Sequence, residues 1–363
     1  MNQNIAKFII LSLIIASLSA CTHKVDLSYF QGDPNKCFDR QKHSNIMIVD
    51  AHHHFRPYGG PARDYQQLLK DIRKAGVLFV TGYGIGQTLP QDTQCHFPAN
   101  CPKTPITPNI NNDINNADNQ LKWPSINPIV NLSMSFFNLN KPQNIKQQII
   151  ELRQKYPNQF NWAGEVNLVK QALFSHGHTI PSIDTIEQWQ PFMDFLAENN
   201  IPIAIHADIG NDNKQTKYLP LFDHVLSRFP NNKIIWLHMG ISKEQLNLPV
   251  KQHIEIIGKR LQKHPKLHID LSWKILQENY FNSDKNRQLY IDLIHQFPDR
   301  FITGSDIVAS KKTSYNSYLG TLQNNSALFE HLNNNAFRMI VLGQNYFNLA
   351  QLPNVAPMVC RTE

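Results

Sequence analysis

Eight runs of mostly apolar residues, each about the length of a β-strand, recur along this chain with helical segments between them. They span residues 46–52, 77–83, 126–136, 161–169, 201–208, 233–240, 267–273 and 300–308. Nearly continuous apolar character is expected of parallel strands that are covered on both faces, whereas a half-exposed antiparallel strand alternates. These runs therefore predict an α/β fold with a parallel sheet.

The stretches between the runs carry apolar residues at three- and four-residue steps, and several end on Pro or Gly, as helices commonly do. They span residues 64–76, 144–157, 186–200, 218–230, 250–265 and 286–298. Eight strands that alternate with helices favour a (β/α)8 TIM barrel. An open doubly wound sheet is the alternative, but no GxGxxG follows the first strand. We assign residues 46–350 to the barrel, 21–45 to a tether and extension, and 351–363 to a tail.

One connection departs from this pattern. From about Gly84 to Trp123 the chain contains Pro, Asn and two cysteines but little periodicity. Long irregular inserts are uncommon unless they are functional or disordered. Because this insert follows the second strand, we expect it over the C-terminal face of the barrel as a lid or substrate wall; a plain surface excursion is the alternative. Its Asn-rich part, NNDINNADNQ (111–120), is typical of a polar loop.

The start of the chain has the features of an export signal. Residues 1–20 have a basic start, an apolar core about half as long as the ~20 residues that span a bilayer, and small residues before a cysteine. Residues 18–21 (LSAC) resemble the lipobox of bacterial lipoproteins, which implies that Cys21 carries a lipid anchor; an ordinary signal peptide is the alternative. By the same resemblance, Thr22 in place of Asp indicates the outer membrane, on the periplasmic side of the envelope.

Four cysteines remain in the exported chain: Cys37, Cys95, Cys101 and Cys360. An even number in an oxidising compartment fits two disulfides. Cys95 and Cys101 share a Pro-rich loop and the other two lie near the two ends, so we favour the pairs 95–101 and 37–360 among three possible connectivities. A thiolate metal site is the rival interpretation, but no CxxC spacing is present.

The net charge of +7 at pH 7 is spread thinly along the chain. No basic run is interleaved with aromatic residues, as a nucleic-acid interface would require. We therefore expect a small-molecule substrate and, through the N-terminal lipid, a membrane, with no nucleic-acid partner. The oligomeric state is not indicated.

Three consecutive histidines end the first strand run, in IMIVDAHHHFRPYG (46–59). Because side chains alternate along a strand, Asp50, His52 and His54 should face one side and His53 the other. Two imidazoles separated by one residue at the C-terminal end of a barrel strand can converge on one metal ion. His53 is then structural.

Ionisable residues also occur at the ends of four later runs: Glu165, His206, His238 and Asp306. An ionisable group buried without a partner is destabilising, and a shared metal ion would remove that cost for all of them. A core or capping role for His238 and a structural role for Glu165 are the alternatives.

This ordered set, HxH on the first strand, single histidines on the fifth and sixth and Asp on the eighth, resembles the amidohydrolase superfamily, in particular the amidohydrolase 2 group. The resemblance covers residues 46–350. It implies a divalent metal, most readily zinc, in one or two copies. The ligands that it implies are His52, His54, His206 and Asp306.

The same resemblance leaves two residues with more than one role. His238 either binds a second ion or assists catalysis beside the metal-activated water. Glu165 stands where two-metal relatives have a bridging carboxylate, often a carboxylated lysine, so it is a further candidate ligand. Lys170 follows the strand end and is not assigned to that role. Asp50 and Asp208 are expected to orient ligand imidazoles.

The expected chemistry follows from the metal. Zinc lowers the pKa of bound water to about 7 and polarises a carbonyl. Asp306 would accept the proton of that water as general base. We expect hydrolysis of a carboxylic ester, lactone or amide. A decarboxylase on the same barrel and a non-catalytic metal-binding or ligand-binding lipoprotein are the alternatives.

Two further features stay open. A second H-x-H, His176 and His178 in SHGHT, lies just beyond the fourth strand run and is expected in a solvated loop. Trp273, after the seventh run, is expected either in a pocket wall or packed beneath a loop.

Overall fold

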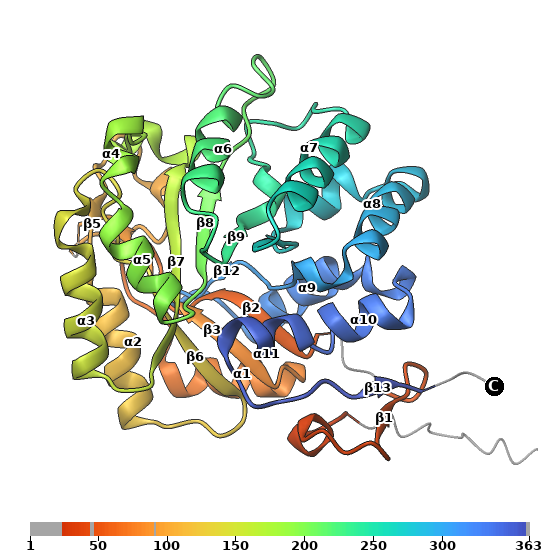
Figure 1. The fold of residues 1–363 in the computed structure, drawn as a ribbon. Coiled ribbons are helices and arrows are strands. Elements are labelled where there is room, and N and C mark those ends of the chain that lie inside the picture. Colours follow the sequence, from red (N-terminus) through yellow and green to blue (C-terminus); the bar gives the residue numbers. More distant parts are fainter. Residues whose placement is uncertain (1–23, 44–46, 91, 361–363) are drawn as a thin grey trace, which may run out of the picture.

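The computed structural model describes residues 24–43, 47–90 and 92–360 (Figure 1). The predicted export signal and the predicted lipid-carrying Cys21 lie outside these residues. Within them, no helix is both long enough and apolar enough to cross a membrane.

Nine parallel strands form one curled sheet in the order β11-β10-β9-β8-β7-β6-β3-β2-β12. They are β2 (Val49–His54), β3 (Phe79–Tyr83), β6 (Ile129–Met134), β7 (Phe160–Val169), β8 (Ile203–Ala207), β9 (Ile234–Trp236), β10 (Leu267–Asp270), β11 (Phe301–Ile302) and β12 (Ile307–Val308). Each of the eight apolar runs contributes to this sheet, which confirms the prediction of a parallel sheet in an α/β fold.

The two ends of the strand order belong to the same stretch of chain, since β11 and β12 are consecutive pieces of residues 301–308. On one side, the backbone N–H of Leu271 donates to the Ile302 carbonyl at 3.0 Å. On the other, the N–H of Ala51 donates to the Thr303 carbonyl at 3.0 Å. The sheet is therefore curled in the manner of a TIM-like fold, with its C-terminal strand ends at one rim.

Helices lie around the outside of the curled sheet (Figure 1). They are α1 (Tyr65–Ala75), α2 (Asn111–Lys122), α3 (Ile145–Lys155), α4 (Ile183–Glu187), α5 (Gln190–Glu198), α6 (Leu219–Arg228), α7 (Val250–Lys263), α8 (Asp284–Gln296), α9 (Tyr315–Ser326), α10 (Asn334–Ile340) and α11 (Gln344–Ala350). The six helical stretches expected from periodicity are confirmed as α1, α3, α5, α6, α7 and α8.

Helix α1 shows why these segments begin and end where they do. The Asp64 side chain accepts from the Gln67 N–H at the N-terminus, and Gly76 closes the helix in the left-handed conformation at φ 92°. Leu68 and Ile72 are buried on the inner face. Capping and periodicity agree here, so the sequence alone predicts the helix.

The insert after β3 contains a short antiparallel pair, β4 (Gln87–Thr88) and β5 (Thr107–Pro108), and ends in α2. The Asn-rich segment is thus a helix, and the prediction of a polar loop is wrong. The buried face of α2 is mostly polar: Asp113 accepts from the backbone N–H groups of Ser135 and Phe136 at 2.8 and 3.0 Å, and Asn116 donates to the Tyr83 carbonyl. Ala117 is also buried and Ile114 packs against the core, but this apolar stripe is narrow and lies among Asn and Asp residues that are typical of loops.

The same insert covers the second H-x-H. His176 Nδ1 lies 2.9 Å from the Thr104 carbonyl, and the Ile106 N–H donates to the His176 carbonyl. His176 and His178 are both buried, so the expectation of a solvated loop is wrong. The insert closes over this turn, and a small apolar cluster around Leu89 and Leu173 packs between them.

Both expected disulfides are present, Cys95–Cys101 within the insert and Cys37–Cys360 between the two ends. The second bond accompanies the parallel pairing of β1 (Cys37–Phe38) with β13 (Met358–Val359), which lie beside each other in Figure 1. The N-terminal extension is thereby fixed to the end of the chain.

Candidate metal centre

Four donor atoms converge at the C-terminal rim of the curled sheet. They are Nε2 of His52 and of His54, Oε2 of Glu165 and Oδ1 of Asp306, all within 4.8 Å of one another. The two Nε2 atoms lie 3.2 Å apart, and each lies 3.4 Å from the Asp306 carboxylate. His54 Nε2 lies 3.1 Å from Glu165. Three strand ends therefore bring together residues that are far apart in the sequence.

His52 and His54 are each oriented by a contact of Nδ1, the ring nitrogen that faces away from the donor cluster. His52 Nδ1 lies 3.1 Å from Asp270 Oδ2, and His54 Nδ1 lies 2.9 Å from the Gly84 carbonyl. Because a carbonyl or a carboxylate accepts, each Nδ1 carries the hydrogen, and each Nε2 turns its lone pair toward the other. Two lone pairs at 3.2 Å repel unless a cation lies between them.

This arrangement fits a divalent metal ion. Imidazole nitrogen and carboxylate oxygen are zinc ligands, and imidazoles that ligate zinc commonly donate their other N–H to a carboxylate or a carbonyl. Without a metal ion, protonated imidazole has to balance the charge of the nearby carboxylates. Burial alone would lower the pKa of His52, but hydrogen bonds to Asp270 and Glu165 raise it to about 10. The donor set is thus built to hold positive charge.

Asp306 contributes a carboxylate that stays ionised. Burial opposes the charged form, but the surrounding histidines, His238, His54 and His52, favour it and hold the pKa of Asp306 below its usual range. Its backbone adopts the left-handed conformation at φ 54°, and its N–H donates to the His52 carbonyl at 2.7 Å. The turn between β11 and β12 thereby presents the carboxylate to the cluster.

His206 lies next to the four-atom cluster rather than in it. Its Nδ1 lies 2.7 Å from Glu165 Oε1, and its Nε2 lies 2.9 Å from Asp208 Oδ1. The expectation that Asp208 orients a histidine is thus met in the geometry. With Glu165 and His238, His206 forms a second group of donors close enough to hold an ion.

Lys170 approaches the same carboxylate, with Nζ 2.5 Å from Glu165 Oε1. Burial would lower the pKa of Lys170, but the Glu165 charge raises it, so the ammonium stays protonated. Lys170 directly follows β7, as expected, yet its side chain folds back into the site. Its place as an ionisable residue at a strand end is the signal in the sequence for a position in the site.

His238 lies on the opposite side of Asp306, with Nε2 3.9 Å from Asp306 Oδ2. Burial is the main cause that lowers its pKa to about 4, so the ring is neutral at neutral pH. Its ring stacks on His52 at 5.3 Å and lies 5.1 Å from Trp273. His238 and Trp273 both have positive φ, and such strained backbone is concentrated at functional sites.

Two expectations about the first strand are wrong: the orienting role of Asp50 and the simple alternation of side chains from Asp50 to His54. Asp50 does not orient His52 or His54; its Oδ2 lies 2.9 Å from His53 Nδ1, and its Oδ1 accepts from the Ser305 N–H. The register of β2 against β3 shifts between Asp50 and His53, which breaks the simple alternation. Asp50 and His53 therefore support the backbone beside Asp306. Asp270, which the sequence reasoning missed, performs the orienting contact instead.

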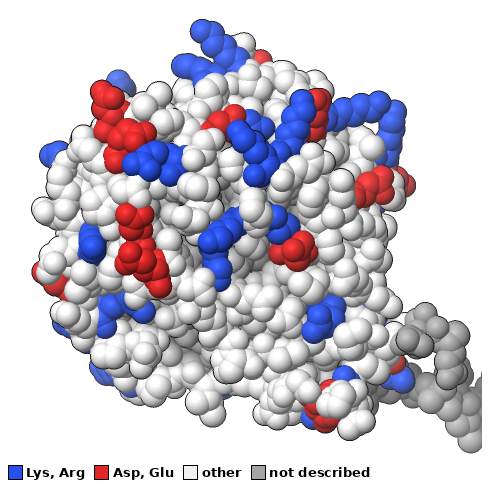
Figure 2. Space-filling view, in the orientation of Figure 1, with Lys and Arg blue, Asp and Glu red and all other residues white. Residues whose placement is uncertain are grey.

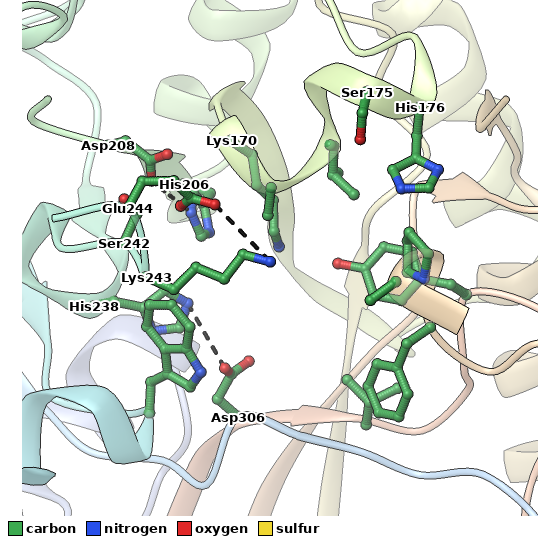
Figure 3. Close-up of a pocket in the computed structure, with 18 of the residues that line it drawn as sticks. Lys170, Ser175, His176, His206, Asp208, His238, Ser242, Lys243, Glu244 and Asp306 are labelled. Atoms are coloured by element: carbon green, nitrogen blue, oxygen red, sulfur yellow. Dashed lines mark hydrogen bonds and ion pairs between the residues drawn. The ribbon is translucent and has the colours of Figure 1, made fainter. Parts of the chain in front are cut away.

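A cavity of about 580 Å³ opens onto the cluster. Figure 3 shows Lys170, His206 and Asp208 on one side, His238 and Asp306 below, and the Lys243 side chain reaching between them. The insert contributes an apolar wall, with Phe97, Pro98, Ala99 and Pro102 among the lining residues, and Trp273 lines the cavity as well. Residues of the insert therefore line this cavity, and Trp273 takes the pocket position that was one of its two expected places.

Comparison with known proteins agrees with this geometry. A family model described as amidohydrolase matches residues 175–327, less than half of the chain. No curated protein sequence matches the chain. The matched segment contains His206, His238 and Asp306, so the family match and the donor cluster indicate a metal-dependent hydrolase.

Two solved structures have a similar fold. An amidohydrolase from Burkholderia multivorans with bound zinc has a TM-score of 0.53 at 12% identity and covers 85% of this chain and 100% of its own. A proposed 2-pyrone-4,6-dicarboxylic acid hydrolase from Pseudomonas putida has a TM-score of 0.51 at 13% identity and covers 85% of this chain and 98% of its own. At these identities the likeness shows the fold.

Proposed function

We propose that this enzyme hydrolyses a carboxylic ester, lactone or amide bond, with a divalent metal ion held by His52, His54, Glu165 and Asp306. The observation that carries the proposal is the convergence of two histidine lone pairs and two carboxylates at the mouth of a cavity. Zinc is the favoured ion, because it suits this donor set and is bound in the Burkholderia multivorans structure.

One ion is favoured over two. The second donor group shares Glu165 with the first, and the Lys170 ammonium already lies against that carboxylate. A second cation there would face the positive charge of Lys170, whose like charge disfavours it. His206 then acts by holding Glu165 in place.

When bound, the ion supplies a polarising charge for a carbonyl group and makes water acidic enough to ionise near neutral pH. Asp306 is ionised and lines the cavity, so it can accept the proton of the attacking water and return it to the leaving group. His238 is neutral. Its Nδ1 faces the Ser272 carbonyl and therefore carries the hydrogen. Its Nε2, which points toward Asp306, is then an acceptor that can be protonated transiently during the reaction.

The cavity indicates what the rest of the substrate is like. About 580 Å³ suits a small molecule, since ligand cavities are typically ~300–1,000 Å³. The Phe97 side chain is 43% exposed although it lines the cavity, so the acyl or leaving group has an apolar part that covers it. Lys103 and Lys243 offer positive charge to an anionic end of the substrate. The name of the Pseudomonas putida relative makes lactones the first compounds to assay.

The test is a hydrolysis screen on zinc-loaded protein with lactones, aryl esters and amides. We expect metal-dependent turnover on at least one class, and a fall in kcat/KM of about 100-fold or more for Asp306→Asn, as for loss of a general base. The matched control is Asp299→Asn, the same change at an exposed position. Turnover that is unchanged by Asp306→Asn, or its absence on every compound with metal bound, would refute the proposal.

We also propose that Cys21 carries a lipid that anchors the protein to the outer membrane on the periplasmic side. The two disulfides support an oxidising compartment. In cells, the wild-type protein should fractionate with membranes and Cys21→Ser should be released in soluble form. A wild-type protein found only in the soluble fraction would contradict the anchor.

A further inference from the structure

A second cavity, of about 290 Å³, lies between the turn that follows β2 and the start of α2. It contains none of the proposed metal ligands, and Tyr58 is the one lining residue that it shares with the larger cavity. Its walls come from three stretches of chain, residues 56–60, 88–89 and 109–115. The lining residues are Arg56, Pro57, Tyr58, Gly59, Gly60, Thr88, Leu89, Asn109, Asn111, Asn112 and Asn115.

Arg56 is the one charged residue in this lining. Its guanidinium makes no hydrogen bond, ion pair or ring contact to any residue of the described part of the chain. Burial lowers its pKa, with no opposing contribution from a carboxylate. An arginine nevertheless remains protonated in proteins. A partly buried guanidinium without a counter-charge is unfavourable unless a bound anion supplies one.

The opposite wall offers neutral hydrogen-bonding groups. The side chains of Asn111 and Asn115 have no partner among the described residues. Asn112 donates to the Ile85 carbonyl at 3.4 Å, and Asn109 donates to Thr88 at 2.9 Å. Amides both donate and accept, so they suit hydroxyl groups as well as oxyanions.

We propose that this cavity is a binding site for a small oxyanion that also carries hydroxyl groups, such as a sugar acid. The Arg56 guanidinium pairs with the carboxylate or phosphate group, for which its planar donor fork is suited. The free asparagine amides bind the hydroxyl groups. A volume of about 290 Å³ limits the ligand to the low end of the usual size range. This site is separate from the proposed hydrolytic centre and does not depend on it.

Calorimetric titration of the full-length protein tests the proposal with three probes: D-gluconate, inorganic phosphate and the uncharged D-glucose. We expect saturable binding of gluconate with a dissociation constant below about 10 mM, and no binding of glucose in that range. Saturable binding of phosphate alone would support an anion site whose natural ligand is a phosphate. Arg56→Gln should weaken binding by about 10- to 100-fold, as for loss of a charge-assisted hydrogen bond.

Two matched variants separate binding from folding. Asn115→Asp places a negative charge in the cavity from an exposed position on α2 and should abolish anion binding; Asn119→Asp, one turn further along α2 and outside the cavity, should not. Arg153→Gln, another partly buried arginine that lines a different cavity, should also bind normally. The proposal is overturned if neither anion binds, if glucose binds as well as gluconate, or if Asn115→Asp and Asn119→Asp bind alike.

Discussion

Asp270 lies outside the cavity and fixes the orientation and the tautomer of His52. Its Oδ2 lies 3.1 Å from His52 Nδ1, and its Oδ1 accepts from the Ser272 N–H at 2.9 Å. The carboxylate thereby fixes both the orientation of His52 and the nitrogen that carries hydrogen. It does so without touching the cavity.

Asp270→Asn should therefore weaken zinc binding by about 10- to 100-fold while the protein stays folded, since partners of ligand imidazoles have effects of that size. The amide oxygen can still accept from Ser272. Competition with a chromophoric chelator measures the affinity, and Asp284→Asn on the surface of α8 is the control. Equal affinities for Asp270→Asn and the wild type would show that His52 needs no support from this carboxylate.

At the level of residues, two signals in the sequence predict site residues. One is a short motif at a strand end, and the other is a single ionisable residue within or just after an apolar run. His52, His54, Glu165 and Asp306 were predicted in this way, and the structure brings them together. Asp50 was assigned wrongly because a register shift in β2 cannot be read from alternation. Asp270 met the same criterion as the others and was overlooked.

At the level of elements, the insert determines the shape of the active-site cavity. Its Cys95–Cys101 bond encloses the short helix Pro98–Asn100, of which Pro98 and Ala99 line the cavity beside Phe97. None of the proposed metal ligands lies on the insert. The wall and the metal centre are therefore separable by mutation.

Replacing both Cys95 and Cys101 by Ser should loosen this wall. We expect KM for the best substrate to rise by about tenfold with kcat little changed, because binding that is equal in ground and transition states is lost. Steady-state kinetics measure both constants. The double variant of Cys37 and Cys360, which joins the chain ends, is the control and should leave KM unchanged. An equal effect of the two double variants would indicate general loosening rather than a local wall.

Elements with an apolar buried face were predictable from the sequence, and α2 was not. Its inner face carries Asp113, Asn116 and Gln120 beside Ala117, and these three polar residues bind backbone and side-chain groups that only the folded chain brings near. Such a helix is specified by tertiary hydrogen bonds, and its sequence reads as a loop.

At the scale of the whole molecule, the curled sheet and its helices follow from the alternation of apolar runs and amphipathic stretches, which is why the fold class was predictable. The packing of polar groups between helices was not. His253 on α7 is fully buried, with Nδ1 2.7 Å from the Tyr290 hydroxyl on α8 and Nε2 2.9 Å from the Met239 carbonyl. Burial is the main cause that lowers its pKa to about 4.

This buried histidine predicts loss of stability in acid. The unfolded chain binds a proton at His253 near pH 6.5 and the folded chain near pH 4, so the free energy of unfolding falls as pH drops through that window. The expected contribution between pH 7 and pH 5 is about 2 kcal/mol. Urea unfolding at both values should show a smaller fall for His253→Gln than for the wild type or for exposed His331→Gln. Parallel falls in all three would contradict the assignment.

The central claim is that the rim of the curled sheet holds a divalent metal, and metal content measures it most directly. Purified full-length protein should contain about one zinc ion per chain, as expected for a site of this donor set. His54→Ala should lose most of that metal, whereas His53→Ala, the next residue on the same strand but bonded to Asp50, should keep it. A folded wild-type protein without metal after zinc is added, or equal loss in both variants, would contradict the claim.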